Sequence, residues 1–343
     1  MPVTLQTLAE NCGLSTATVS RALAGYRYVN AEVRARVQRE AERIGYQRNH
    51  LVGALMSHVR RTQSQRFIGN LAIVHVPSPQ AMEIGAQERR IIDSAIARAR
   101  ELGFSAELFE LGTDQRGETA FARVCRARGV TGVIFVYPGP IEAPRFFPWE
   151  DFSAIAIDFA RGEPLLDTVC HDHFATFKAA LRELRGANYR RIGLFIERFK
   201  DERTDGRWSG AFLSLQNRPG GIGRVPVLSP EKIDEPGFLA WYRRHEPDLV
   251  IGHLDRAVGW LRRAGVRVPQ TTAFFSLNWL DRSLPCAGID PQLELQGRVA
   301  AESLISQVHR GERGLPAHPR LITVRGRFVP GPTVRSAGLR EGG

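Results

Sequence analysis

The sequence predicts an α/β protein in which a small head of three helices precedes a larger body of parallel, doubly wound sheets. Two short amphipathic segments flank a glycine turn near the N-terminus, and strand-like apolar runs alternate with helical ones from residue 68 onward. The chain of 343 residues is also too long for one ordinary hydrophobic core. We therefore expect a head at residues 1–48, a hinge or linker at 49–66 and a body at 67–335.

The head begins with a helix, a tight turn and a second helix. A first apolar stripe falls within residues 5–11, and Gly13 in the turn that follows is free to adopt a positive φ. The segment 14–23 separates into two faces at 100° per residue. Its apolar face consists of Val19, Ala22 and Leu23, and its polar face of Thr16, Ala17, Ser20 and Arg21.

That polar face suits a helix lying in the major groove of DNA. Short side chains let the backbone approach the base edges, and Arg21 can donate two hydrogen bonds to a guanine. Ser15 is a good N-cap for this helix, and Asn30 is one for a third helix that should end at Gly45. The pattern favours a helix-turn-helix, with an ordinary three-helix bundle as the alternative.

The positive charge is concentrated in the first fifth of the chain. The formal net charge is +11, and residues 1–66 hold ten arginines against four glutamates, which contributes +6. This distribution is typical of a head that binds a polyanion, joined to a nearly balanced body. An arginine-rich proteome would also raise the pI, but it would not concentrate the charge in the head.

Two cycles of strands and helices fill the body. Strands are expected at 68–76, 105–111, 132–136, 154–158, 191–196, 249–252, 272–277 and 321–324. Helices are expected at 90–103, 120–128, 173–185, 208–216, 258–264 and 293–310. This alternation indicates a parallel sheet in each of two lobes. We expect the first lobe at about 67–165 and 288–314, and the second at about 166–284 and 320–330.

The runs VTLQTLAENCGLSTATVSRALAG and VNAEVRARVQREAERIGY resemble the head of lactose-repressor-type (LacI/GalR) regulators. The resemblance implies that Thr16, Ala17 and Arg21 read base edges. It also implies that four hydroxyl side chains hold phosphates. These are Thr4, Ser15, Thr18 and Ser20.

The same resemblance makes the linker a hinge helix that folds on DNA. Asn49 matches the capping asparagine of that helix, and Leu55 matches a leucine that wedges between the central base pairs in the minor groove. A plain flexible linker is the alternative, since Gly53 weakens a helix by about 1 kcal/mol relative to alanine.

For the body, the resemblance implies a two-lobed fold like that of periplasmic binding proteins, with an effector between the lobes. Asp158 at the end of a strand, Arg207 at the start of a helix and Asn278 after another strand occupy effector positions. Phe159, Trp208 and Trp279 stand next to them, and aromatic faces are surfaces on which a sugar ring packs. An ordinary turn residue, a surface cation and a loop cap are the alternative readings of the three polar positions.

Other chemistry finds little support. Residues 220–226 are rich in glycine but lack the G-x-G-x-x-G spacing, and no paired carboxylates or nucleophile elbow stand out. His171 and His173 invite a metal site, although Asp172 between them is explained as a helix cap. The four cysteines are far apart, so we expect buried, reduced thiols in the cytoplasm. We expect no catalysis, cofactor, metal or membrane span.

Together these features predict a homodimeric, sequence-specific DNA-binding transcriptional regulator. The expected partners are a palindromic double-stranded DNA operator and a small-molecule effector, which is a sugar or related metabolite. One alternative is a DNA-binding regulator whose effector site has degenerated, and a shift of the melting temperature with a ligand would exclude it. The other is an enzyme on a doubly wound fold, which turnover of a substrate would reveal.

Overall fold

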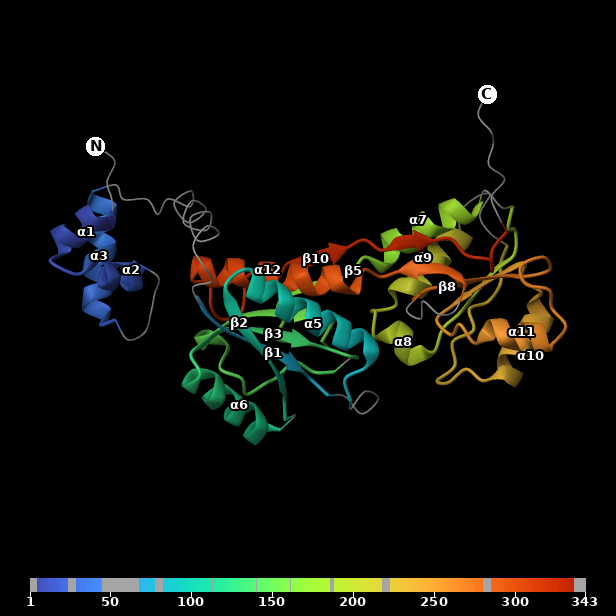
Figure 1. Cartoon of the computed structure of the whole chain (residues 1–343), viewed down its shortest axis with the longest axis horizontal. Coiled ribbons are helices and arrows are strands. Elements are labelled where there is room, and N and C mark those ends of the chain that lie inside the picture. The colour runs from blue at the N-terminus through green and yellow to red at the C-terminus, as the bar shows by residue number, and fades with distance from the viewer. Residues whose placement is uncertain are drawn as a thin grey trace, which may run out of the picture.

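The computed structural model describes residues 5–23, 29–44, 68–77, 83–112, 114–139, 141–160, 162–185, 188–217, 223–279 and 285–335. Within them the chain forms a helical head and an α/β body with two lobes, as predicted (Figure 1). Among the described helices, none combines the length and the apolar character needed to cross a lipid bilayer.

The head consists of three short helices around one small core. They are α1 (Leu5–Cys12), α2 (Thr16–Leu23) and α3 (Ala31–Arg43). The predicted caps are confirmed: the Thr18 backbone N–H donates to Ser15 Oγ at 3.2 Å, and the Glu32 N–H donates to Asn30 Oδ1 at 2.9 Å. The turn residue Gly13 has φ 58°, as expected. Leu8, Ala9, Cys12, Val19, Ala22, Val29, Val37 and Ala41 form the buried core.

The first lobe contains a six-stranded parallel sheet in the order β10-β5-β4-β3-β1-β2. Its strands are β1 (Gly69–His75), β2 (Phe104–Glu110), β3 (Val130–Val136), β4 (Ser153–Ile157), β5 (Asp167–His171) and β10 (Leu321–Val324). Helices α5 (Ala86–Glu101) and α12 (Leu293–Arg310) pack on one face, and α6 (Gln115–Ala127) on the other (Figure 1). The short helix η1 (Trp149–Asp151) packs on the same face as α6. Alternate strand residues are buried toward each helical layer, as a doubly wound sheet requires.

The second lobe contains a five-stranded sheet in the order β11-β9-β8-β7-β6. Its strands are β6 (Ile192–Phe195), β7 (Leu249–Gly252), β8 (Ala273–Ser276), β9 (Ala287–Asp290) and β11 (Arg327–Val329), of which β11 runs antiparallel to β9. Helices α7 (His173–Arg185) and α9 (Arg207–Gln216) cover one face, and α10 (Glu235–His245) and α11 (Ala257–Arg263) the other. The short helix α8 (Arg198–Glu202) precedes α9.

The chain changes lobes at points that differ from the expected ones. We expected 166–284 and 320–330 in the second lobe, but β5 pairs with β4 and β10 pairs with β5 in the first sheet. Conversely, β9 pairs with β8 in the second sheet, although the first lobe was expected to resume at 288. The cause is long-range pairing, which an apolar run does not specify.

A buried carboxylate fastens β10 to the edge of the first sheet. Asp167 Oδ1, at the start of β5, accepts the Arg320 backbone N–H at 2.8 Å, and Asp167 Oδ2 accepts Arg320 Nε at 2.9 Å. Gln307 in α12 donates to Asp167 Oδ2 at 3.0 Å. One side chain therefore links β5, the segment entering β10, and α12.

Candidate functional site

The carboxyl ends of the parallel strands in the two lobes face each other, and we call this region the inter-lobe edge. In the first lobe it includes His75 at the end of β1, Tyr137 after β3 and Asp158 after β4. In the second lobe it includes His253 after β7 and Asn278 after β8. Ligands of doubly wound proteins bind at such strand ends.

The turn between α8 and α9 brings two arginines to the inter-lobe edge. This turn contains two consecutive left-handed residues, Asp205 with φ 55° and Gly206 with φ 63°. Arg203 lies at the start of the turn, and Arg207 is the first residue of α9. Both therefore leave the second lobe from one short, sharply bent segment.

Arg207 reaches across to the first lobe. Its guanidinium carbon lies 4.6 Å from the centre of the Phe159 ring, directly after Asp158. Its Nε is buried and has no hydrogen-bond partner among the described residues. A planar guanidinium in this position can donate paired hydrogen bonds to an oxygen-rich ligand. The predicted effector contact of Arg207 stays a prediction.

Asp158 lies at the predicted edge, but its carboxylate is already engaged. The residue adopts a left-handed backbone with φ 61°. Its Oδ2 accepts Arg203 Nη2 at 3.0 Å, and Arg203 Nη1 lies 3.1 Å from Glu88 Oε1 in α5. The predicted role of Asp158 as a direct effector contact therefore has a competing partner inside the protein.

Asn278 follows β8 at the same edge of the second sheet. Its backbone N–H donates to Ser276 Oγ at 3.4 Å. The described contacts join Arg203 to Asp158 and Arg207 to Phe159, but they do not connect Asn278 to either cluster.

The predicted cap explains Asp172, since its Oδ1 accepts the Ala175 N–H at 3.0 Å. The flanking rings of His171 and His173 stack with centroids 4.7 Å apart, and Trp208 meets both edge-on. Burial lowers the pKa of His171, and burial together with the charges of Arg207 and Arg203 lowers the pKa of His173 to about 3. Both rings are therefore neutral at pH 7.

Trp208, which follows Arg207, does not offer an aromatic face to a sugar ring, contrary to expectation. Trp208 is only 6% exposed and belongs to the core beneath α7 and α9. The reason is its place on the inward face of α9, where it packs against Phe177. Its ring is consequently not available to stack on a sugar.

Sequence reasoning identified Arg207 but missed several other polar groups at the inter-lobe edge. Six buried nitrogen or oxygen atoms have no hydrogen-bond partner among the described residues. They are both ring nitrogens of His75, the hydroxyl of Tyr137, Nδ1 of His173 and of His253, and Nε of Arg207. Buried polar atoms are almost always hydrogen-bonded, so each needs an explanation. A usable signal existed, because His75, Tyr137 and His253 each lie within or directly after an expected strand.

The second-lobe histidine at this edge is held by a carboxylate. His253 Nε2 lies 3.2 Å from Glu197 Oε2, after β6. Burial lowers the pKa of His253 despite this neighbour, and burial also lowers the pKa of His75. Neutral imidazoles carry one donor and one acceptor each, which suits hydroxyl groups.

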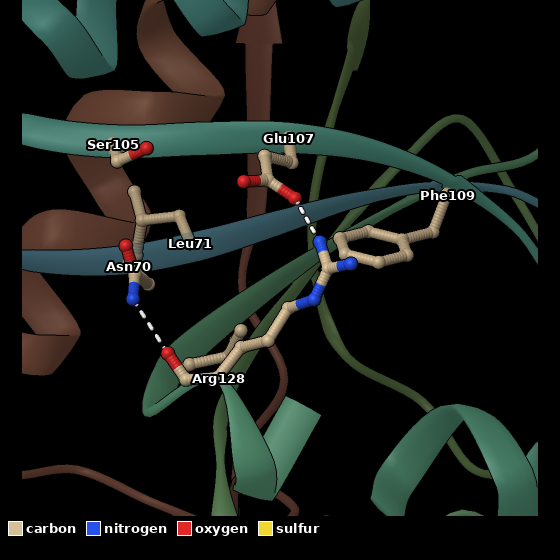
Figure 2. A pocket seen from close by; sticks show the side chains of 7 residues that line it. Asn70, Leu71, Ser105, Glu107, Phe109 and Arg128 are labelled. Atoms are coloured by element: carbon tan, nitrogen blue, oxygen red, sulfur yellow. Dashed lines mark hydrogen bonds and ion pairs between the residues drawn. The ribbon is translucent and has the colours of Figure 1, made fainter. Parts of the chain in front are cut away.

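A separate hollow of about 240 Å³ lies near the amino ends of β1 to β3. Figure 2 shows Arg128 spanning it, with its guanidinium paired to Glu107 and lying near the Phe109 ring, while Asn70 donates to the Arg128 carbonyl. Its polar side chains satisfy one another, so it is a weaker ligand site than the inter-lobe edge.

Six of the candidate DNA-contacting residues, at positions 15–18, 20 and 21, lie on or directly before α2. Ser15 Oγ and Thr18 Oγ1 lie 2.8 Å apart, and both are at the N-terminal end of the helix. Val19 and Ala22 are fully buried, as the expected apolar face requires. The backbone of Thr16, Ala17, Ser20 and Arg21 belongs to α2, whereas their side chains, together with all of Thr4, Asn49 and Leu55, lie outside the described residues.

Comparisons with known families match both parts of the chain. Residues 4–49 match the family described as bacterial regulatory proteins, lacI family. Residues 181–334 match the periplasmic binding protein-like domain. The first match covers the three-helix head, and the second covers most of the second lobe together with α12 and the last strands.

Two curated relatives are regulators. The HTH-type transcriptional regulator AglR of Rhizobium meliloti is 59% identical over 49 residues, which is 14% of each chain. The HTH-type transcriptional regulator PtxS of Pseudomonas plecoglossicida is 25% identical over 240 residues, which is 69% of this chain and 66% of PtxS. The alignments thus span 14% and 66% of these relatives' own lengths.

Solved structures share the fold along nearly the whole chain. The complex of the transcriptional regulator CelR with cellobiose aligns with a TM-score of 0.59 at 18% identity, covering 96% of this chain and 99% of that one. The lac repressor dimer bound to operator and the anti-inducer ONPF aligns with a TM-score of 0.56 at 16% identity, covering 97% and 99%. From its helix-turn-helix head to its two-lobed body, the chain thus joins a head that matches the lacI family of bacterial regulatory proteins to a body that matches the periplasmic binding protein-like domain, the organisation of LacI/GalR-type transcriptional regulators.

Proposed function

We propose that this regulator is a dimeric repressor that binds a palindromic operator and responds to a small, hydroxyl-rich metabolite held at the inter-lobe edge. The observation that carries the ligand part is the set of six buried polar atoms without partners. A bound ligand with several hydroxyl or carboxylate oxygens would supply the missing hydrogen bonds.

On the DNA side, α2 is the recognition helix. Thr16, Ala17 and Arg21 contact base edges, and Thr4, Ser15, Thr18 and Ser20 hold the phosphates. The buried positions of Val19 and Ala22 support this assignment, because they leave the opposite face of α2 to the DNA. Asn49 and Leu55 of the hinge, residues 49–66, complete each half-site in the minor groove.

On the ligand side, Arg207 provides the charged contact and neutral histidines provide the rest. His173 and His253 come from the second lobe, whereas His75 and Tyr137 come from the first. A ligand that engages both groups changes how the lobes pack, and the dimer passes this change to its two hinges. Asp158 and Asn278 contribute to ligand binding either by contacting the ligand or by positioning the residues next to them.

We propose no catalytic role for the chain. Both curated relatives are named as transcriptional regulators. The CelR–cellobiose complex, which shares the fold, is named for a bound sugar. That complex supports a carbohydrate or related compound as the first class to test on this chain.

Two linked measurements test the function. Selection of bound DNA from a random pool with the full chain should yield a palindrome with two-fold symmetric half-sites. Thermal melting with monosaccharides, disaccharides, polyols and sugar acids should then reveal a compound that raises the melting temperature of the wild type and changes its affinity for the selected site. A palindrome without any responsive compound would favour the effector-independent alternative, and recovery of unrelated sequences would contradict the DNA assignment.

A further inference from the structure

Arg203 joins the two lobes through a buried cluster of three charges. It lies at the start of the α8–α9 turn of the second lobe, and both carboxylates that it contacts belong to the first lobe. Arg203 Nη1 lies 3.1 Å from Glu88 Oε1, and Arg203 Nη2 lies 3.0 Å from Asp158 Oδ2. Figure 1 shows α8 beside the start of α5, where Glu88 lies. We call these three residues the Arg203 cluster.

The Arg203 cluster is shielded from water. The side chains of Arg203, Glu88 and Asp158 are 12%, 8% and 15% exposed. Burial disfavours the charged guanidinium, but the two carboxylates outweigh it and hold the pKa of Arg203 above its ordinary value. The guanidinium fork suits this geometry, because its separate Nη groups can each serve one carboxylate.

Opening of the lobes would separate the only cation of this cluster from both of its anions. Glu88 and Asp158 would stay together on the first lobe without compensation, and Arg203 would leave with the second. Opening would therefore forfeit both charge-assisted contacts of the guanidinium and leave two like charges side by side. The cluster therefore favours the closed arrangement in the absence of any ligand.

We propose that the Arg203 cluster is a latch that keeps the two lobes closed before ligand binds. The ligand then acts on a closed molecule, and its energetic effect includes loosening or reinforcing the latch. This last step depends on the ligand response proposed above, whereas the latch itself does not. The main role of Asp158 is accordingly to bind Arg203 in the latch and not to hydrogen-bond the ligand.

The neighbouring charges are consistent with this role. Lys200 in α8 lies close enough to Glu88 and Glu197 for their charges to act on it, but burial lowers the pKa of its amine. His173, whose pKa is lowered by burial and by the charges of Arg207 and Arg203, is neutral at pH 7. Arg203 is the residue that makes direct ion pairs with both first-lobe carboxylates, Glu88 and Asp158.

The distance between the lobes can be measured without a ligand. Spin labels on cysteines in place of Asp93 in α5 and Lys232 in the second lobe report it by pulsed electron resonance, because both residues are exposed. The four native cysteines are buried, which favours selective labelling. The labelled full chain is diluted with unlabelled chain, so that only distances within one protomer are observed.

Arg203→Gln should shift the distribution to longer distances, raising the ratio of open to closed molecules at least about tenfold. Arg203→Lys keeps the charge but lacks the guanidinium fork, so it should give an intermediate shift. It takes the place of Arg203→Gln in the test if that variant does not fold. The triple variant Glu88→Gln, Asp158→Asn, Arg203→Gln removes all three charges and should return the distribution toward the wild type.

Arg198→Gln is the matched control. Arg198 is the first residue of α8, the helix that ends just before Arg203, and it forms an ion pair with Glu231 at 2.7 Å, but both residues are exposed and belong to the second lobe. This variant should keep the wild-type distances. The latch is wrong if Arg203→Gln and Arg203→Lys keep the wild-type distances, or if Arg198→Gln opens the lobes equally. Either result would leave the proposed ligand response untouched, since no ligand is present.

Discussion

At the scale of single residues, two arginines four positions apart have different surroundings. Arg203 is bound by two carboxylates of the first lobe, whereas Arg207 lies on the Phe159 ring with its Nε unpartnered. The sequence singled out only Arg207, and only the partners of the two arginines distinguish a structural contact from a group available to a ligand.

Arg207→Ala should weaken effector binding more than tenfold. Loss of the guanidinium leaves ligand acceptors unpaired in a site with little water, which costs about 1.5–3 kcal/mol. Calorimetry with the compound found by thermal melting measures this loss. Operator affinity without ligand should stay near that of the wild type, since the head is unchanged. Unchanged ligand affinity would remove Arg207 from the site and weaken the assignment of Asp158 and Asn278 as well.

Arg21→Ala should reduce specific DNA binding and relax the preference for one G·C pair. A paired contact to a guanine is worth about 1–3 kcal/mol of discrimination. Titration of the selected operator and of a random duplex separates the two effects, because binding to random DNA at low salt should change little. Equal losses on both duplexes would show that Arg21 contacts only phosphate.

At the scale of elements, the hinge at residues 49–66 connects a complete head to a complete body. A leucine wedge bends the duplex, and a pyrimidine–purine step such as CG at the centre makes that bend easier. Leu55→Ala should therefore reduce both the bend and the affinity, as measured by circular-permutation mobility and titration. Straight DNA in the wild-type complex, or no preference at the central step, would contradict the wedge.

The same element offers a change in the opposite direction. Gly53→Ala should tighten operator binding, because alanine lowers the entropy of the unbound hinge and favours a helix by about 1 kcal/mol. The comparison uses the operator at one salt concentration for both proteins. Weaker binding by this variant would show that the hinge needs a glycine conformation.

At the scale of the whole molecule, buried neutral histidines make stability depend on pH. Burial lowers the pKa of His75, His171, His173 and His253 in the fold. An unfolded histidine titrates near pH 6.5, so below that pH the unfolded chain binds protons that the fold does not accept. The stability is therefore fully present above about pH 7.5 and falls as the pH drops below about 6.5.

Each histidine that stays neutral in the fold should lower the free energy of unfolding by up to about 1.4 kcal/mol per pH unit between about pH 6 and 5. Urea denaturation at several pH values from about 7.5 to 5.5 measures this slope. His173→Gln should make the slope shallower, because it removes one of the histidines that stay neutral in the fold. A stability that is constant over this range would contradict the neutral assignment.

Local patterns in the sequence were sufficient for much of the fold. The caps at Ser15 and Asn30 are where expected, and β7, α12 and β10 have the expected bounds of 249–252, 293–310 and 321–324. The reason is that periodicity and caps act within one or two turns of chain. The same patterns identified the lacI-family head, because it is a compact local motif.

Only the tertiary structure decided which lobe each strand joins and which polar groups meet. β5, β9 and β10 pair across the chain in ways that their apolar residues leave open, and the sequence pattern missed α8 and α10 as well. Arg203 reaches a carboxylate 45 residues away, and Trp208 is buried by α7. The sequence thus determined most of the elements, the helix-turn-helix head and the class of protein, whereas long-range packing determined the inter-lobe edge, because its contacts form only between folded lobes.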